Sequence, residues 1–273
     1  MKSAITVLKE QIQYFHLIRR LSLFELKSNN SNNYLGMLWE LISPAIQVTI
    51  YWFVFSTLRS RDPVDVGGET VPFFPWLIAA FFLWIFFHQS IVQGSRSIFS
   101  RLRILSKMNF PMSVIPNFVI FSRFYVHLML LGITIVIFQL LGYYVNIYYL
   151  QLFYFIFASF CLFYSISLIT STLSTMIRDV HMFLTSTLRM MLYLSGVLWP
   201  LTLLSDFDML MKLMQLNPVY YLLQGYRHAL FGVDWYFITQ WEYTLFFWAV
   251  VVVLFLIGAK MHVKFRRHFI DYL

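Results

Sequence analysis

The twenty residues FFPWLIAAFFLWIFFHQSIV, at positions 73–92, decide the fold, because they contain no Asp, Glu, Lys or Arg. A bilayer core of about 30 Å needs about 20 apolar residues in a helix that rises about 1.5 Å per residue. The stretch therefore predicts a helix that crosses a membrane. The whole chain has the same character, since 60% of its 273 residues are hydrophobic, 12% are charged and its mean hydropathy is +0.70. This composition indicates an integral membrane protein and excludes a soluble domain.

Similar apolar stretches recur along the chain and predict an all-α membrane protein with six transmembrane helices. We place them at residues 36–58, 73–92, 114–141, 149–174, 183–204 and 239–259. Between the fifth and sixth, the segments 208–216 and 219–231 are apolar but shorter than the roughly 17 residues that a span needs. Asn217 and Pro218 separate them. We expect a re-entrant or external helical hairpin there, since an exposed backbone break is not tolerated in lipid.

The basic residues predict the orientation in the membrane. Of 20 Lys and Arg residues, 5 lie in residues 2–27, 4 in 94–111, 1 in 175–182 and 4 in 260–273. Six spans place all of these stretches on one face, and the positive-inside rule makes that face cytoplasmic. We therefore expect a multi-pass protein of the plasma (cell) membrane with both termini in the cytoplasm.

The segment 1–33 has the pattern of a helix that lies on the membrane surface. At 100° per residue, five basic residues fall within one arc, and an apolar set lies opposite. The basic set is Lys2, Lys9, His16, Arg20 and Lys27, and the apolar set is Val7, Tyr14, Phe15, Ile18 and Leu21. This pattern predicts a cytoplasmic interfacial helix on anionic lipid. A soluble amphipathic helix that packs on a partner is the alternative.

Several kinds of chemistry are missing from the sequence. There is no Gly-x-x-x-x-Gly-Lys-Ser/Thr motif, so we expect no nucleotide hydrolysis by this chain. No Asp or Glu lies in the middle of a predicted span, which argues against a proton-driven carrier. The seven His residues show no metal-ligand spacing and Cys161 has no second Cys. We predict no catalytic residue, no bound cofactor, no metal site and no nucleic-acid partner.

The link at 94–111 is the predicted contact with an energy-supplying partner. As a helix it would have an apolar stripe of Ile98, Leu102 and Leu105. The opposite stripe would consist of Arg96, Ser100, Arg103 and Lys107. Such a short cytoplasmic helix can seat in a groove of a soluble ATPase. Alternatively, its positive charges only face lipid phosphates.

Short motifs in a fixed order then point to a family. They are Tyr34-Leu35-Gly36-Met37-Leu38-Trp39 followed by Pro44 and Tyr51-Trp52, KMNFPMSVIP at 107–116, Arg178-Asp179, SGVLWP at 195–200, Asn217-Pro218 and Tyr226-Arg227. Over nearly its whole length, the chain resembles the permeases of type 2 ABC exporters of cell-surface polysaccharides. Gly196 departs from the pattern, since relatives often carry Pro there. Residues 9–55, SRFYVHL at 122–128 and the basic end at Asp271-Tyr272-Leu273 look most like wall teichoic acid translocation permeases.

The resemblance implies a single transmembrane permease domain over 1–273, with a six-span region at 36–259 and a cytoplasmic tail at 260–273. It further implies a homodimer bound to two copies of a soluble ABC ATPase, which would hold ATP and Mg²⁺. The implied cargo is an anionic glycopolymer linked to undecaprenyl pyrophosphate. Its movement would run from the cytoplasmic to the outer leaflet. The alternative cargo is another lipid-linked polysaccharide, such as O-antigen or capsule.

Candidate cargo-contacting residues follow from that implied cargo. A lipid pyrophosphate needs cations at the inner interface, and Arg19, Arg20 and Arg101 are candidates. Rings can contact the CH faces of sugars or polyols, and the candidate pore aromatics are Tyr51, Trp52, Phe55, Phe81 and Trp84. Core packing or lipid contact is the alternative role for any one of these rings.

Two arginines, Arg123 and Arg189, fall inside predicted spans, where a charge costs about 3 kcal/mol on insertion scales. We expect at least one of them to contact polymer phosphate or the dimer seam. Snorkelling toward the inner headgroups is the alternative. A transferase that acts on lipid-linked glycans would need acidic or His clusters at the interface, and none is apparent. A drug-efflux permease would not need the basic inner rim.

Overall fold

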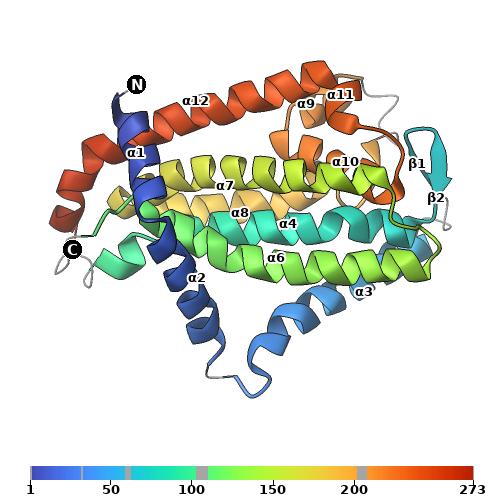
Figure 1. The fold of residues 1–273 in the computed structure, drawn as a ribbon, viewed down its shortest axis with the longest axis horizontal. Helices are drawn as coiled ribbons and strands as arrows, with labels where there is room; N and C mark the ends of the chain where they lie inside the picture. The colour runs from blue at the N-terminus through green and yellow to red at the C-terminus, as the bar shows by residue number, and fades with distance from the viewer. Residues whose placement is uncertain (1, 32, 59–62, 103–109, 202–207, 273) are drawn as a thin grey trace.

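The computed structural model describes residues 2–31, 33–58, 63–102, 110–201 and 208–272. Four helices lie side by side and form the bundle at the centre of the protein (Figure 1). They are α4 (Phe73–Arg96), α6 (Val114–Leu140), α7 (Gln151–Met176) and α8 (Asp179–Leu194). Helix α12 (Trp241–Phe265) packs along α7, while α3 (Trp39–Leu58) leaves the bundle at an angle and contacts mainly α4.

Five helical segments of the described chain are long and apolar enough to cross a membrane. They are Gly36–Thr57, Phe73–Arg96, Val114–Leu140, Ile147–Met176 and Trp241–Phe269. These segments coincide with the predicted spans one to four and six. The prediction of an all-α membrane protein is therefore confirmed, with one small strand pair added to it.

The remaining predicted span, 183–204, differs from the structure at both ends. Helix α8 begins at Asp179 and ends at Leu194, and its 16 residues rise only about 24 Å. The helix stops because Gly196 adopts a positive φ of 66°, which breaks the helical repeat. Residues 202–207 lie outside the described part of the chain, so the described helix is shorter than the prediction.

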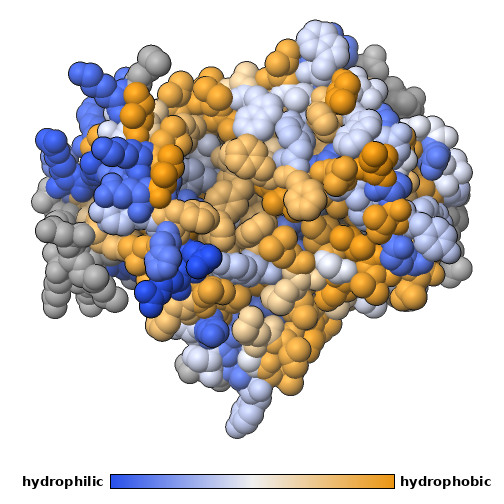
Figure 2. Space-filling model, in the orientation of Figure 1, coloured by the Kyte–Doolittle hydropathy of each residue, from blue (hydrophilic) through white to orange (hydrophobic). Residues whose placement is uncertain are grey.

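The bundle has two ends of different character. At one end α4 ends, α6 begins and both termini lie, and hydrophilic residues gather there; we call it the basic end (Figures 1 and 2). At the other end β1 (Val64–Val66) pairs antiparallel with β2 (Glu69–Val71), and we call it the hairpin end. Hydrophobic residues cover most of the surface between them on the face that Figure 2 shows. Both termini thus share one end, as the predicted topology requires.

The N-terminal region consists of two helices, not one. Helix α1 (Lys2–Gln13) and helix α2 (Phe15–Asn30) meet at a kink at Tyr14 and run across the bundle axis (Figure 1). All five residues of the predicted basic stripe are exposed, and Val7 and Ile18 of the apolar side are buried. Phe15 is exposed, so the apolar side divides into a face on the bundle and a face directed outward.

Short helices complete the hairpin end. Helix α9 (Asp208–Gln215) and helix α10 (Pro218–Phe231) begin and end within one residue of the two predicted halves. The Asn217 side chain caps α10 by accepting a hydrogen bond of 3.0 Å from the Val219 amide, and Pro218 opens the helix. One face of α10 is buried against α4 and α7, and the short α11 (Tyr236–Thr239) leads into α12.

A small second core holds the basic end together. It joins α2, the 3-10 turn η2 (Phe99–Arg101), the start of α6 and the C-terminal 3-10 segment η5 (Arg266–Tyr272). Its buried members include Ile18, Ile98, Ile115 and Phe269. The segment after α4 is therefore fixed against both chain termini. Two further 3-10 turns, η1 (Gly36–Leu38) and η3 (Ile147–Leu150), precede α3 and α7.

Candidate functional site

A cavity of about 450 Å³ opens at the basic end, between α2, the end of α4, η2 and the start of α8. We call it the basic-end cavity. Its lining is mostly polar and consists of Glu25, Asn29, Gln93, Arg96, Phe99, Ser100, Arg101, Val119 and His181. Three residues that the sequence singled out, Arg96, Ser100 and Arg101, therefore share one cavity.

Arg101 joins α2 to η2 at this cavity. Its guanidinium forms an ion pair with Glu25 of α2 and donates a hydrogen bond of 3.0 Å to the Ser97 carbonyl. The same group lies 5.4 Å from the ring centroid of Phe118 on α6. These contacts hold Arg101 in place within the chain, so its predicted pyrophosphate contact would compete with Glu25.

Arg96 and Ser100 are exposed at the rim, one helical turn apart. Ile98 and Leu102 are buried, as the predicted apolar stripe requires, although the segment forms a 3-10 turn and not a continuous helix. The third residue of the predicted apolar stripe, Leu105, and the other predicted docking residues, Arg103 and Lys107, lie outside the described residues. The rim therefore presents a cation and a hydroxyl outward.

His181 closes the cavity from α8. Its Nδ1 atom lies 2.7 Å from the Ser95 hydroxyl, so α8 is tied to the end of α4. Arg96 provides a cationic charge beside this wall.

Arg19 and Arg20 are both exposed on α2 and do not line the cavity. Neither forms an ion pair with any residue in the described part of the chain. Their charges remain available to an anion at the surface next to α2.

A groove of about 470 Å³ lies between α3, α4 and α8, and we call it the α3–α8 groove. It brings together three of the five predicted pore aromatics, Tyr51, Phe81 and Trp84, with Arg189 at its edge. The other two do not line the groove. Trp52 packs edge-on against Phe74 at 5.4 Å, and Phe55 packs against Phe73 at 6.5 Å.

The two arginines of the predicted spans have different surroundings. Arg123 is buried and forms an ion pair of 2.8 Å with Glu40 at the start of α3. Arg189 is exposed on α8 and lines the α3–α8 groove. Arg123 is thus neutralised within the chain, whereas Arg189 faces outward.

Sequence reasoning missed the arrangement around Arg227. This side chain is fully buried, and its Nη2 atom donates to the carbonyls of Gly196, at 3.0 Å, and Val197, at 3.3 Å. Its guanidinium carbon also lies 3.6 Å from the ring centroid of Trp76. An Arg inside an apolar, tyrosine-rich segment was a signal that this side chain is buried, but it does not identify the partners.

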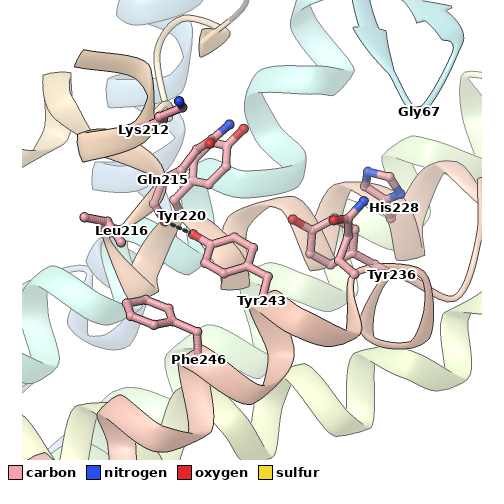
Figure 3. A pocket seen from close by; sticks show the side chains of 10 residues that line it. Gly67, Lys212, Gln215, Leu216, Tyr220, His228, Tyr236, Tyr243 and Phe246 are labelled. Carbon is pink, nitrogen blue, oxygen red and sulfur yellow. Dashed lines mark hydrogen bonds between the residues drawn. The ribbon is translucent and has the colours of Figure 1, made fainter. Parts of the chain in front are cut away.

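A second missed feature is a cavity of about 700 Å³ at the hairpin end, which we call the tyrosine pocket. Tyr220, Tyr236 and Tyr243 reach it from three different helices (Figure 3). Across the described residues, by contrast, no group of three His, Cys, Asp or Glu side chains is placed to hold a metal ion.

The chain is thus a multi-pass helical membrane protein with a cation-rimmed cavity at one end of its bundle. Residues 16–231 match the family described as ABC-2 type transporter, and the chain belongs to that family. It is similar to the O-antigen export system permease protein RfbA of Myxococcus xanthus, with 23% identity over 82% of this chain and 83% of the relative. It is also similar to RfbA of Klebsiella pneumoniae, with 22% identity over 91% of this chain and 92% of the relative.

Proposed function

We propose that this chain is the membrane-spanning subunit of an ATP-driven exporter of a lipid-linked cell-surface polysaccharide. The basic-end cavity is the observation that carries the proposal. It places an exposed cation, Arg96, at the end of α4, next to a short segment that packs against both terminal regions. Motion of a partner bound there would pass directly to α2, α4 and α6. In this proposal the basic end faces the cytoplasm and the hairpin end faces outward.

The partner is a soluble ABC ATPase, in two copies, which binds the ATP and Mg²⁺. Its docking surface comprises Arg96 and Ser100, together with Arg103 and Lys107. The permease itself acts as a homodimer. Helix α3 supports this proposal, because only 11% of its most apolar 18-residue window is buried inside one chain. A second copy would cover part of that face, and Arg189 in the α3–α8 groove would lie near the seam.

The cargo is wall teichoic acid on undecaprenyl pyrophosphate, moved from the cytoplasmic to the outer side of the plasma membrane. Arg19 and Arg20 would bind the pyrophosphate, because they are exposed and have no carboxylate partner among the described residues. Arg101 would join them only after releasing Glu25. The rings of Tyr51, Phe81 and Trp84 would contact the polymer along the α3–α8 groove, with Trp52 and Phe55 beside it.

The six-span topology belongs to this proposal as well. Helix α8 and the residues after it would form the fifth span. Helices α9 and α10 would form the hairpin on the outer side, where Asn217 and Pro218 interrupt the backbone. An even number of spans would then return the C-terminal segment to the cytoplasm.

A specific observation favours a second cargo. Both relatives named above are O-antigen export permeases, and their similarity covers most of each chain. The alternative cargo is therefore an O-antigen-type or capsular polysaccharide on the same kind of lipid carrier. The cavity and the topology would serve either polymer.

Purification of the tagged chain from gently solubilised membranes tests the partner. We expect a soluble ATPase with a Walker motif at equal stoichiometry, and Arg96→Glu should reduce its recovery at least fivefold. Arg267→Glu is the matched control, because Arg267 is exposed at the same end but lies outside the cavity. Recovery of the permease alone, from the wild type as well, would overturn the proposal.

Depletion of the chain tests the cargo. We expect lipid-linked polymer to accumulate on the cytoplasmic side, where a polymer-degrading enzyme added outside the cells cannot reach it. Analysis of the trapped polymer for polyol phosphate distinguishes teichoic acid from a neutral O-antigen-type glycan. Unchanged polymer export after depletion would contradict both assignments.

A further inference from the structure

The tyrosine pocket is built from parts that are distant in the sequence. Lys212 and Gln215 come from α9, Tyr220 and His228 from α10, Tyr236 from α11 and Gln240 from the turn before α12. Figure 3 shows these elements around one space, with Gly67 of the β-turn at its far side. With an open volume of about 700 Å³, the pocket falls in the range of small-molecule and saccharide sites.

The three tyrosines offer different groups to this space. Tyr243 uses its hydroxyl to donate to the Gln215 carbonyl, and so presents its ring (Figure 3). The Tyr220 hydroxyl accepts a hydrogen bond of 2.7 Å from Gln224 and still has its own proton to donate. The Tyr236 hydroxyl has no hydrogen-bond partner among the described residues, although the side chain is largely buried. The Tyr236 hydroxyl is therefore available to form a hydrogen bond with a ligand.

Tyr236 is also held in one place and one protonation state. Its backbone amide donates to the Gln151 side chain at 3.1 Å, and its ring centroid lies 4.5 Å from that of His228. His228 in turn lies 2.7 Å from the Asp234 carboxylate. Burial raises the pKa of Tyr236 well above its usual range, so its hydroxyl is a neutral donor and acceptor.

A chain of hydrogen bonds lies behind the pocket lining, where the Tyr221 ring packs against Tyr236 at 5.7 Å and Tyr243 at 5.2 Å. Trp248 donates to the Tyr154 hydroxyl at 2.9 Å, Tyr154 lies 3.0 Å from the Tyr221 hydroxyl, and Tyr221 lies 2.8 Å from that of Thr244. These contacts join α7, α10 and α12. The pocket is therefore preformed, which lowers the entropic cost of binding.

The residues that line the pocket indicate which kind of ligand it can bind. Aromatic rings pack on the CH faces of sugars and polyols, while phenol and amide groups bind hydroxyls in either direction. Lys212 adds a cation, and no carboxylate of the described chain lines the space. This combination suits a ligand that is rich in hydroxyls and bears phosphate. A purely apolar compound would leave the amides and the Tyr236 hydroxyl unpaired.

We propose that the tyrosine pocket binds a short hydroxyl-rich, phosphate-bearing segment of the exported polymer at the outer end of the transporter. The inference rests on the proposed function, because that function supplies the polymer. Gln240 and Tyr236 hydrogen-bond its hydroxyls, Tyr243 packs on its carbon chain and Lys212 pairs with its phosphate. A bound segment would hold the emerging chain on the outer side while the basic end takes up the next stretch.

Binding of a synthetic oligo(glycerol phosphate) to the full-length permease, copurified with its ATPase in nanodiscs, tests this site. We expect Tyr236→Phe to weaken binding about fivefold, the effect of one hydrogen bond, and Tyr236→Phe with Gln240→Ala at least tenfold. Lys212→Gln should remove the preference for this probe over uncharged maltohexaose. Tyr144→Phe is the matched control, because Tyr144 is exposed and lies outside the pocket.

Three outcomes would overturn the inference. These are absence of probe binding to the wild type, equal affinity of the wild type and the double variant, and complete competition by phosphatidylglycerol added to phosphatidylcholine nanodiscs. The last would assign the pocket to lipid headgroups. Each leaves the export function standing, since depletion of the chain tests that function separately. Tyr236→Phe keeps the ring and its packing, so we expect the variant to fold. A misfolded variant would be recognised by its loss from the nanodisc fraction.

Discussion

The two ends of the bundle hold their arginines in different ways. Toward the basic end, Arg101 pairs with Glu25, Arg123 with Glu40 and Arg266 with Glu10. At the hairpin end, Arg227 is held by three backbone carbonyls, those of Trp76, Gly196 and Val197, and by an indole ring, with no carboxylate partner among the described residues.

The difference shows which contacts can be removed by substitution without leaving an unpaired group. A carboxylate partner can be neutralised together with its arginine, so an ion pair can be removed as a unit. Backbone carbonyls cannot be substituted, so the loss of Arg227 would leave buried acceptors without a donor. The basic end is thus held by replaceable pairs, and the hairpin end by one guanidinium with a fixed set of partners.

Arg227→Met should give the largest effect. It removes the donor to the Gly196 and Val197 carbonyls and the cation over Trp76, and we expect a loss of roughly 4 kcal/mol in the free energy of unfolding. Denaturation in mixed micelles measures that loss. Arg227→Lys is the matched variant, because it keeps a cation but not the planar fork, and should lose about half as much. Equal stability of all three proteins would show that the carbonyls find other donors.

The sequence predicted the basic end better than the hairpin end. Runs of apolar residues and clustered charges identify the spans and the basic face, because hydropathy and charge act over local windows. The contacts of Arg227 join residues 31 and 151 positions away in the chain, and no local pattern encodes them. Likewise Tyr220, Tyr236 and Tyr243 lie on separate helices, so no single helical stripe reveals their pocket.

Arg123→Gln should have the next largest effect. The variant leaves the largely buried Glu40 carboxylate without its cationic partner and with only the Asn30 amide as a donor, and we expect a loss of about 3 kcal/mol in the free energy of unfolding. Arg123→Gln with Glu40→Gln should recover at least about 1 kcal/mol, since the two sites are coupled. The same micelle denaturation measures both.

Export distinguishes the two roles considered for Arg123. If the double variant regains stability but not export, Arg123 also contacts the polymer. Normal export and normal assembly of Arg123→Gln would show that Arg123 does not contact the polymer or the dimer seam. Its role would then be limited to the ion pair with Glu40. A double variant no more stable than Arg123→Gln would contradict the exchangeable pair.

Arg101→Gln should have a smaller effect, because both partners of this pair are partly exposed to solvent. We expect a loss of about 1 kcal/mol, since solvent screens partly exposed pairs. Raised salt should reduce the difference between Arg101→Gln and the wild type, but not the effect of Arg227→Met. Thermal unfolding in detergent at low and high ionic strength provides the measurement. A salt-independent loss would mean that the packing of Arg101 on Phe118 outweighs its ion pair.

The smallest change in stability belongs to Arg19 and Arg20, which are exposed and have no ion pair in the described chain. Arg19→Gln with Arg20→Gln should alter the free energy of unfolding by less than about 0.5 kcal/mol. If these residues bind the carrier, however, the affinity of nanodisc-embedded protein for farnesyl pyrophosphate should fall about tenfold. Lys264→Gln, an exposed cation at the same end, is the control. Unchanged affinity would leave Arg101 as the remaining candidate for pyrophosphate binding. The ion pair between Arg101 and Glu25 would then have to open, because a guanidinium group already held by a carboxylate has little capacity left for a second anion.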